Sequence, residues 1–375
     1  MEVFWFKNNH EHRNDVLRFG FMRLNQTGQI RYREFPLQHC VRFGFSDRCA
    51  YHEHRHTSLF LLRLAKRDIR CLVDSEDSFF WMCPLISDVD CYFCAGYNSE
   101  FFKKNRMFEP YPWQTAPEIS FYRERANELV LKWGAYFGAV RKFVPIAPSM
   151  GNRRKIGRAK QKWINLNQKI HSVVSGDRYW ANDFLDYEER YSEFQHLRQQ
   201  SLVYDVVLLD TLWGWPRHRL KLHSNLKSIS GRYRIHSRLN WSDPVPHDGS
   251  ASSPLNSKDF PIETRPISNY EGMVASSRLG VYAVGFHWGW RSIMSFALML
   301  GLPIYMDKPV LEPWFKLDDF KIFWNERGDW KDLDGHLDSI SEAEWRRIKT
   351  HNQNLYDEVM APERIAKYII DTALQ

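Results

Sequence analysis

The sequence has no long apolar run. A membrane-spanning helix needs about 20 consecutive apolar residues, and the longest apolar stretch here, residues 295–302, is much shorter and includes Ser295 and Gly301. The chain begins MEVFWFKNNHEHRND, which has neither the cationic start nor the apolar middle of a signal peptide. We therefore expect a cytoplasmic protein that is either soluble or peripheral to a membrane.

Two nucleotide-binding motifs are also missing. The chain contains no GxGxxG, and no GxxxxGK followed by Ser or Thr. Neither the Rossmann dinucleotide fingerprint nor a P-loop is therefore present. There are no internal repeats. A nucleotide site in this protein would have to use a different strand–turn–helix unit.

Cysteine is confined to the first part of the chain. All six cysteines precede residue 95, and only Cys91 and Cys94 have the CxxC spacing of half a zinc site. The surrounding residues, 88–95, are typical of a strand, on which side chains three positions apart point to opposite faces. Because there is no second CxxC, we expect buried reduced thiols and no metal site.

The overall composition is that of an ordinary globular protein. A length of 375 residues predicts about two domains, and 43% hydrophobic and 26% charged residues argue against disorder. A net charge of +7 favours anionic partners in general. Aromatic residues reach 15%; most are expected to fill cores, and some to stack on sugar rings.

Basic residues form one dense cluster: Arg153, Arg154, Lys155, Arg158, Lys160 and Lys162. Such a cluster is either a solvated loop-and-helix face or a contact for an anionic membrane or acceptor. Peripheral membrane contact would use Arg153, Arg154, Lys155 and Arg158. Nucleic-acid binding is not expected, because no binding motif accompanies the cluster.

The pattern of apolar residues changes near residue 200. Before it, we expect a strand or short helix at 56–64, strands at 67–73 and 87–95, and helices at 122–139 and 179–200. After it, the near-continuous apolar run 202–210 predicts a strand buried on both faces of a parallel sheet.

Strands and helices then alternate, as in a doubly wound α/β domain. We expect strands at 232–237, 279–285 and 302–306, helices at 217–228, 292–300, 341–358 and 362–374, and a loop at 240–267. The predicted domains are 1–200, on the acceptor side, and 201–375, which binds the nucleotide sugar.

The most informative segment is the strand–turn–helix at 279–300. In a doubly wound sheet, ligands bind outside the carboxyl ends of the strands. A turn with Gly285 and Gly289 offers backbone N–H groups, and the next helix, beginning at Ser292, adds its positive end. Arg291 would supply a forked cationic donor for a pyrophosphate. The alternative is an ordinary strand–turn–helix with a surface arginine.

The same region resembles the donor-binding region of exostosin-type GT-B glycosyltransferases. The resemblance rests on Tyr270-Glu-Gly-Met-Val-Ala-Ser-Ser, on Trp290-Arg-Ser, on Ala297-Leu-Met-Leu-Gly-Leu-Pro and on Glu312-Pro-Trp-Phe. It implies an α/β fold with two Rossmann-like domains facing a cleft, and transfer of a sugar from a UDP- or GDP-sugar to a glycan or glycolipid acceptor, with no further cofactor. The donor-binding residues would be Arg217, Arg219, Ser277, Gly285, Gly289, Arg291, Ser292, Asp307 and Glu312.

The chain departs from this family at one position. Phe296 stands where the family has a helix Glu that holds the nucleotide ribose. That contact would pass to Asp307 or Glu312, and the missing Glu favours inversion over retention. Two alternatives remain: a catalytically inactive sugar- or nucleotide-binding relative, and another nucleotide-sugar α/β enzyme such as an epimerase.

An inverting transferase needs a general base on the acceptor side. Asp74 and Asp77 follow a predicted strand, and His54 lies in a histidine-rich segment, so these three are the candidates. The two Asp-x-Asp pairs, at 88–90 and 332–334, do not follow an apolar strand as the metal-dependent GT-A class requires. We therefore expect metal-independent catalysis.

Overall fold

Two separate β-sheets organise the chain, each in its own unit. The computed structural model describes residues 1–8, 11–52, 56–146, 150, 158–212, 214–240, 269–285 and 288–375. Unit 1 comprises Met1–Tyr97, Ala135–Phe194 and Asp357–Gln375, and unit 2 comprises Asn98–Gly134 and Gln195–Tyr356. Both units combine helices with a sheet, so the fold is α/β, as predicted.

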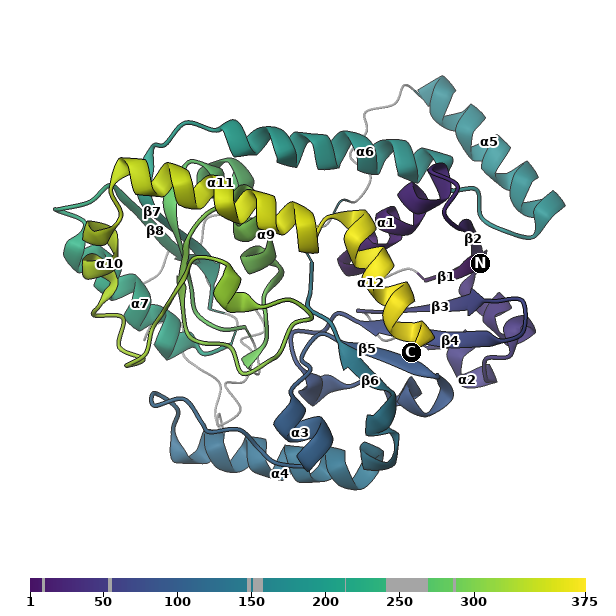
Figure 1. The fold of residues 1–375 in the computed structure, drawn as a ribbon, viewed down its shortest axis with the longest axis horizontal. Helices are drawn as coiled ribbons and strands as arrows, with labels where there is room; N and C mark the ends of the chain where they lie inside the picture. Colours follow the sequence, from purple (N-terminus) through teal and green to yellow (C-terminus); the bar gives the residue numbers. More distant parts are fainter. Residues whose placement is uncertain are drawn as a thin grey trace. The chain divides into compact units, whose positions relative to one another are not determined.

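Unit 1 contains a six-stranded mixed sheet in the order β2-β1-β3-β4-β5-β6 (Figure 1). Its strands are β1 (Glu2–Lys7), β2 (Arg31–Pro36), β3 (Thr57–Arg63), β4 (Asp68–Asp74), β5 (Cys91–Cys94) and β6 (Val140–Lys142). β3 is antiparallel to both neighbours, because a tight turn, in which the Leu64 N–H donates to the Arg67 carbonyl, returns the chain directly into β4. This central antiparallel strand departs from a purely parallel Rossmann-like sheet.

The predicted strands of unit 1 are confirmed within a few residues. The segment predicted as either strand or helix, 56–64, is the strand β3. Cys91 and Cys94 lie on β5, and all six cysteines are buried free thiols. β1, β2 and β6 were not predicted.

The helices of unit 1 are α1 (Asp15–Gln26), α2 (Asp47–Ala50), α5 (Arg158–Ser175), α6 (Ala181–His196) and α12 (Pro362–Leu374). α12 lies against α1 (Figure 1) and buries Ile365 and Ile369. The two helices approach closely at Gly20, where a Cβ atom would lie 1.9 Å from the Pro362 carbonyl oxygen. The last helix therefore requires glycine at this position of α1.

Unit 2 contains a five-stranded parallel sheet in the order β11-β10-β9-β7-β8. Its strands are β7 (Tyr204–Thr211), β8 (Ile235–Asn240), β9 (Ser277–Tyr282), β10 (Ile304–Met306) and β11 (Ile322–Trp324). The central strands are buried on both faces, as the apolar run at 202–210 predicts. Val206 pairs with Ile235 of β8 on one side and Leu279 of β9 on the other.

The helices of unit 2 are α3 (Ser99–Lys104), α4 (Ala116–Trp133), α7 (Pro216–Ile229), α8 (Tyr270–Ala275), α9 (Ser292–Leu300), α10 (Leu333–Ser339) and α11 (Glu342–Val359). The predicted helix 292–300 has the same bounds as α9. The predicted loop 240–267 lies almost wholly outside the described residues. Across the described part of the chain, no helix is both long and apolar enough to cross a membrane.

The units differ from the predicted division at residue 200 in two long segments, and the change from unit 1 to unit 2 comes after Phe194. Residues 98–134 belong to unit 2, where Tyr122 of α4 packs against Trp215 and Trp288. Residues 357–375 belong to unit 1, because the apolar side of α12 is buried on α1. Both assignments depend on contacts between residues far apart in sequence.

We expect Gly20→Ala to lower the free energy of unfolding by about 1–3 kcal/mol, because the added methyl group overlaps backbone atoms of Pro362. Gly335→Ala in α10 is the matched control: the new methyl group meets no atom within 4 Å, so the variant should gain about 0.5–1 kcal/mol. Urea unfolding measures both. Equal effects of the two substitutions would contradict the close α1–α12 contact.

Candidate ligand site at the carboxyl edge of the parallel sheet

The strand order of unit 2 marks one edge of its sheet as a ligand-binding position. Numbered within the unit, the order is 2-1-3-4-5, which is the flavodoxin-like doubly wound arrangement. In such sheets the crevice opens where the connections change direction, outside the carboxyl ends of the first and third strands. Here these strands are β7 and β9, so a ligand is expected to bind next to the loops that follow them.

A buried carboxylate, Asp210, ends β7. The Arg291 guanidinium donates two hydrogen bonds to it, of 2.7 and 2.6 Å, and Arg219 of α7 donates a third, of 3.3 Å. Burial alone would raise the pKa of the Asp210 carboxyl, but the charges of Arg219 and Arg291 hold it below its ordinary value. Asp210 is therefore a carboxylate that joins the end of β7 to α7 and to the start of α9.

A second buried carboxylate, Asp307, follows β10. It accepts hydrogen bonds from His218 Nε2 at 2.9 Å, from Asn325 Nδ2 at 2.8 Å and from the Val284 backbone N–H at 3.2 Å. These donors come from α7, from the end of β11 and from the end of β9. Asp307 was predicted as a ribose contact, but in this structure its oxygens are already occupied by protein donors.

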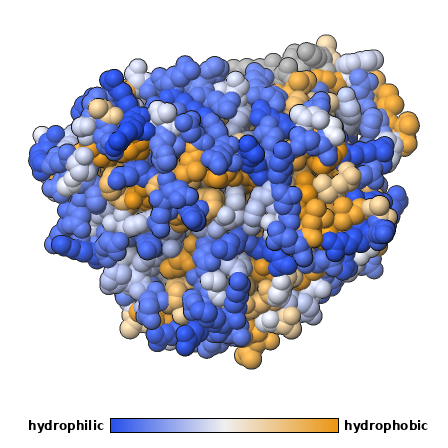
Figure 2. Space-filling view, in the orientation of Figure 1, coloured by the Kyte–Doolittle hydropathy of each residue, from blue (hydrophilic) through white to orange (hydrophobic). Residues whose placement is uncertain are grey.

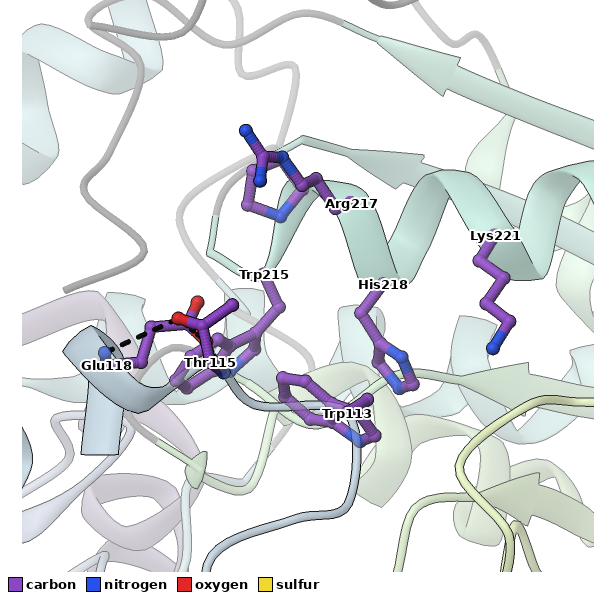
Figure 3. Close-up of a pocket in the computed structure, with 8 residues that line it drawn as sticks. Trp113, Thr115, Glu118, Trp215, Arg217, His218 and Lys221 are labelled. Atoms are coloured by element: carbon purple, nitrogen blue, oxygen red, sulfur yellow. Dashed lines mark hydrogen bonds between the residues drawn. The ribbon is translucent and has the colours of Figure 1, made fainter. Parts of the chain in front are cut away.

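A pocket of about 270 Å³ lies at the N-terminus of α7 (Figure 3). The first turn of α7 contains no acidic residue, and no side chain caps it. Arg217 and Lys221 project from this helix, exposed, next to the helix end that already carries partial positive charge. The positive charges of these side chains and of the helix end together favour the binding of an anion. The complete lining is Trp113, Thr115, Glu118, Trp215, Pro216, Arg217, His218 and Lys221.

His218 and Glu118 are both buried polar side chains of this pocket. The His218 ring stacks on Trp113 at a centroid distance of 4.0 Å and contacts Trp330 at 4.8 Å. Because Nε2 faces the Asp307 carboxylate, Nε2 carries the ring proton. His218 Nδ1 and Trp113 Nε1 are buried and have no hydrogen-bond partner among the described residues.

The loops around the pocket hold unusual backbone conformations. Trp215, Trp288 and Trp330 all have φ between 50° and 65°, a region that bulky residues rarely adopt. Trp215 is fixed there by a 2.8 Å hydrogen bond from its Nε1 to the Gly285 carbonyl. Such strain persists where surrounding contacts enforce it, and it is concentrated at functional sites.

The predicted glycine turn after β9 is present but closed on itself. The Gly285 N–H donates to the Gly289 carbonyl at 2.8 Å, and a Cβ at Gly285 would lie 2.8 Å from both that oxygen and Arg291 Cγ. Arg291 is the N-cap residue of α9, and Ser292 at its first turn is exposed. The turn therefore packs Arg291 onto Asp210, whereas the sequence predicted that Arg291 faces a diphosphate.

Two other residues predicted to bind the nucleotide sugar form hydrogen bonds within unit 2 instead. Ser277 is buried at the amino end of β9 and donates to the Val274 carbonyl; it lies about 17 Å along the strand from the carboxyl edge. Glu312 accepts from the backbone N–H of Ser99 at 2.8 Å. The structure brings Arg217, Arg219, Gly285, Gly289, Arg291 and Asp307 to the carboxyl edge, and it places Ser277 at the opposite one.

The predicted general bases lie in unit 1. Asp74 is buried at the end of β4, where it accepts hydrogen bonds from Tyr92 Oη and from the backbone N–H groups of Cys83 and Glu76. Asp77 is partly exposed and forms a 2.9 Å ion pair with Arg13. His54 lies outside the described residues.

The predicted basic cluster is only partly described. Arg153, Arg154 and Lys155 lie outside the described residues, and Arg158 is exposed at the start of α5. In the described part of the chain, no three His, Cys, Asp or Glu side chains converge as metal ligands.

Sequence reasoning found only Arg217 among the lining residues of the pocket. Arg217 and Lys221 are four positions apart on one predicted helix, a spacing that places both on the same side; this signal pointed to Lys221. Nothing near Trp113 in the sequence connects it with His218, because the two are about a hundred residues apart and meet only in the folded unit.

Comparisons with known proteins give no family. No protein-family model and no curated protein matches the chain. Among solved structures, the chain is similar to the N-terminal domain of Candida albicans trehalose-6-phosphate phosphatase, with 13% identity and a TM-score of 0.33. The match covers 63% of this chain and 50% of that one, so the chain spans about half the length of that structure. A similarity at this level shows neither a shared family nor a shared function.

We expect Asp210→Asn to lower the free energy of unfolding by about 3–5 kcal/mol, because it removes the carboxylate charge that pairs with the buried Arg219 guanidinium. Folding lowers the pKa of Asp210 from its ordinary value of 3.8. The ion pairs therefore stabilise the protein fully at a pH above 3.8, and this stabilisation is lost as the pH falls through the lower pKa of the folded state. The difference between wild type and variant should therefore be constant near neutral pH and narrow below about pH 3.8.

The control is Asp338→Asn, which removes an exposed ion pair with Arg232. Exposed pairs contribute little, so this variant should unfold like wild type in the same urea titrations. If both substitutions have the same small effect, the Asp210 cluster does not hold the loops together.

Proposed function

We propose that the chain is a GT-B glycosyltransferase that moves a sugar from a UDP- or GDP-sugar to a glycan or glycolipid acceptor. One observation carries the proposal: a pocket lined by Arg217 and Lys221, at the uncapped N-terminus of α7, lies at the carboxyl end of β7, where a 2-1-3-4-5 sheet binds ligands. The sequence resemblance of the same unit to exostosin-type enzymes supports this choice of ligand class.

The chemistry of the reaction fits such a pocket. A nucleotide-sugar donor leaves a nucleoside diphosphate, so negative charge that develops on the phosphates must be stabilised. The uncapped N-terminus of α7 and the exposed cations Arg217 and Lys221 are suited to this task. We assign binding of the diphosphate to Arg217 and Lys221, because Arg219 and Arg291 already donate hydrogen bonds to Asp210.

The aromatic residues of the pocket position rather than stack the ligand. Trp113 is covered by His218 on one face and by Tyr111 on the other, so only its edge is open to a ligand. Contact with this edge, together with the charges of Arg217 and Lys221, would fix the orientation of the donor.

In this proposal unit 1 binds the acceptor. Asp77, whose carboxylate is partly exposed, is our choice of general base among the predicted candidates, because Asp74 already accepts three hydrogen bonds from its own unit. The reaction would be an inverting transfer without a metal ion.

A second candidate is a binding protein without transferase activity. Phe296 occupies the position of the ribose-binding Glu and is buried in α9. Asp307 and Glu312, the predicted substitutes for that Glu, are both hydrogen-bonded to protein donors. These contacts would leave the nucleotide without a carboxylate for its ribose.

We expect UDP or GDP at millimolar concentration to raise the melting temperature; at about 100 times the dissociation constant, the gain is about 2.7 kcal/mol. Arg217→Ala and Lys221→Ala should each weaken binding by roughly 10-fold or more, because each removes a charge-assisted contact. Lys227→Ala, an exposed cation in the last turn of the same helix, is the control and should bind as wild type. If UDP, GDP, CDP and ADP produce no shift, the donor site is refuted.

Turnover separates the two candidates. Incubation with UDP- and GDP-sugars should release the nucleoside diphosphate and free or transferred sugar if the chain is a transferase. If the wild-type protein binds the nucleotide sugar but releases no nucleoside diphosphate at a saturating donor concentration, the result would favour a binding protein without transferase activity.

A further inference from the structure

Helix α5 of unit 1 is amphipathic, and its polar side faces the protein. Ile164, Gln168, Ser172 and Ser175 are the half-buried positions of the described helix, spaced four, four and three residues apart. The pocket beneath α5 is lined by its polar residues Asn165, Gln168, Lys169 and Ser172, together with Lys7, Arg178, Tyr179 and Asp183 of the same unit. Apart from Ile164, the half-buried positions are polar, so the helix attaches to unit 1 mainly through its hydrophilic side.

Its apolar side is exposed. Trp163, Val173 and Val174 are 62%, 79% and 82% exposed, and Leu166 and Ile170 lie between them, each about half exposed. Their spacing of three or four residues places all five on one side of the helix. Figure 2 shows hydrophobic side chains at the upper right edge, where Figure 1 places α5.

This orientation is the reverse of that of an ordinary surface helix, which buries its apolar stripe. Scattered exposed apolar residues need no explanation, but a continuous stripe marks an interaction surface. The stripe of α5 extends over about three turns, and it includes a tryptophan, a residue suited to the boundary between water and hydrocarbon.

The charge of α5 restricts the partner. Residues 158–175 contain no acidic residue, and Arg158, Lys162 and Lys169 are exposed basic residues of the helix. Lys162 and Lys169 lie seven positions apart, on one flank of the apolar stripe. The preceding residues Arg153, Arg154 and Lys155 add positive charge in the sequence. A second copy of this helix would bring like charges together, whereas an anionic surface would neutralise them.

We propose that α5 binds the surface of a membrane that contains anionic phospholipids. Trp163, Ile170, Val173 and Val174 enter the boundary between headgroups and acyl chains, and the basic residues of α5 contact the lipid phosphates. The helix lies in the plane of the membrane and does not cross it. This proposal does not depend on the nucleotide site in unit 2.

The test is co-sedimentation of the full chain with vesicles of phosphatidylcholine, with and without phosphatidylserine. Wild type should pellet with the phosphatidylserine vesicles, and salt should release it. Val173→Gln/Val174→Gln should lower the partition coefficient by about 10-fold or more, because two exposed apolar side chains no longer insert. Lys162→Gln and Lys169→Gln should each lower it by about five-fold.

Leu131→Gln is the matched control, because Leu131 of α4 is 88% exposed but belongs to no basic helix; it should leave partition unchanged. A thiol-reactive fluorophore on Val173→Cys provides an independent readout, since the six native thiols are buried, and its emission should shift to the blue on vesicles. Circular dichroism checks that the variants keep their helices, and the nucleotide thermal shift should be unchanged in all of them.

Equal binding to both vesicle types, no binding to either, or full binding by Val173→Gln/Val174→Gln would overturn the proposal. Self-association of wild type that Val173→Gln/Val174→Gln abolishes, without vesicle binding, would also overturn it and identify the stripe as a contact between copies. Binding of an acidic protein by the stripe, without binding to vesicles, would also overturn the proposal.

Discussion

Two buried carboxylates hold the carboxyl edge of the parallel sheet together. Asp210 connects the end of β7 to α7 and to the start of α9, and Asp307 connects the end of β10 to α7, β9 and β11. A doubly wound sheet supplies the strand ends, but the loops that leave them have no regular ladder to fix their positions. In unit 2 these two side chains take that role, and α7 is the helix that both of them contact.

This arrangement divides the polar side chains of α7 into two groups. His218 and Arg219 point inward and bind the two buried carboxylates, whereas Arg217 and Lys221 are exposed beside the pocket. A buried ion pair gains little net stability, because desolvation offsets the attraction, yet loss of one partner is costly. The pairs therefore act as positional constraints on the loops, and the charge left over is available to a ligand.

Unit 1 uses the same device in a different sheet. Asp74 ends β4 and accepts hydrogen bonds from the next strand, through Tyr92, and from the backbone of the loop that follows β4. A carboxylate at the end of a strand was interpreted from the sequence as a candidate base, but its hydrogen bonds show that it fixes the loop. A carboxylate at the end of a strand can therefore organise a loop, and the three hydrogen bonds that Asp74 accepts give it this role in unit 1.

Much of the secondary structure could be predicted because it depends on local patterns. The apolar runs that became β3, β4, β7 and β10 and the periodic segments that became α9 and α12 were visible without any knowledge of the fold. The antiparallel position of β3 was not, because strand direction depends on which strands pair. The assignment of residues 98–134 to unit 2 likewise follows from aromatic contacts of Tyr122 that have no local signature.

Local sequence patterns were enough to predict the α/β class, the burial of the strands and the concentration of charged residues near the strand ends of unit 2. What those residues do depends on their neighbours in the folded unit, because contacts between distant segments set the role of each side chain. Arg291 had the position of a phosphate ligand in the sequence, but Asp210, far away in the chain, holds it. Trp113 had no distinguishing pattern, yet it forms a wall of the pocket, since its partner His218 reaches it only when the unit folds.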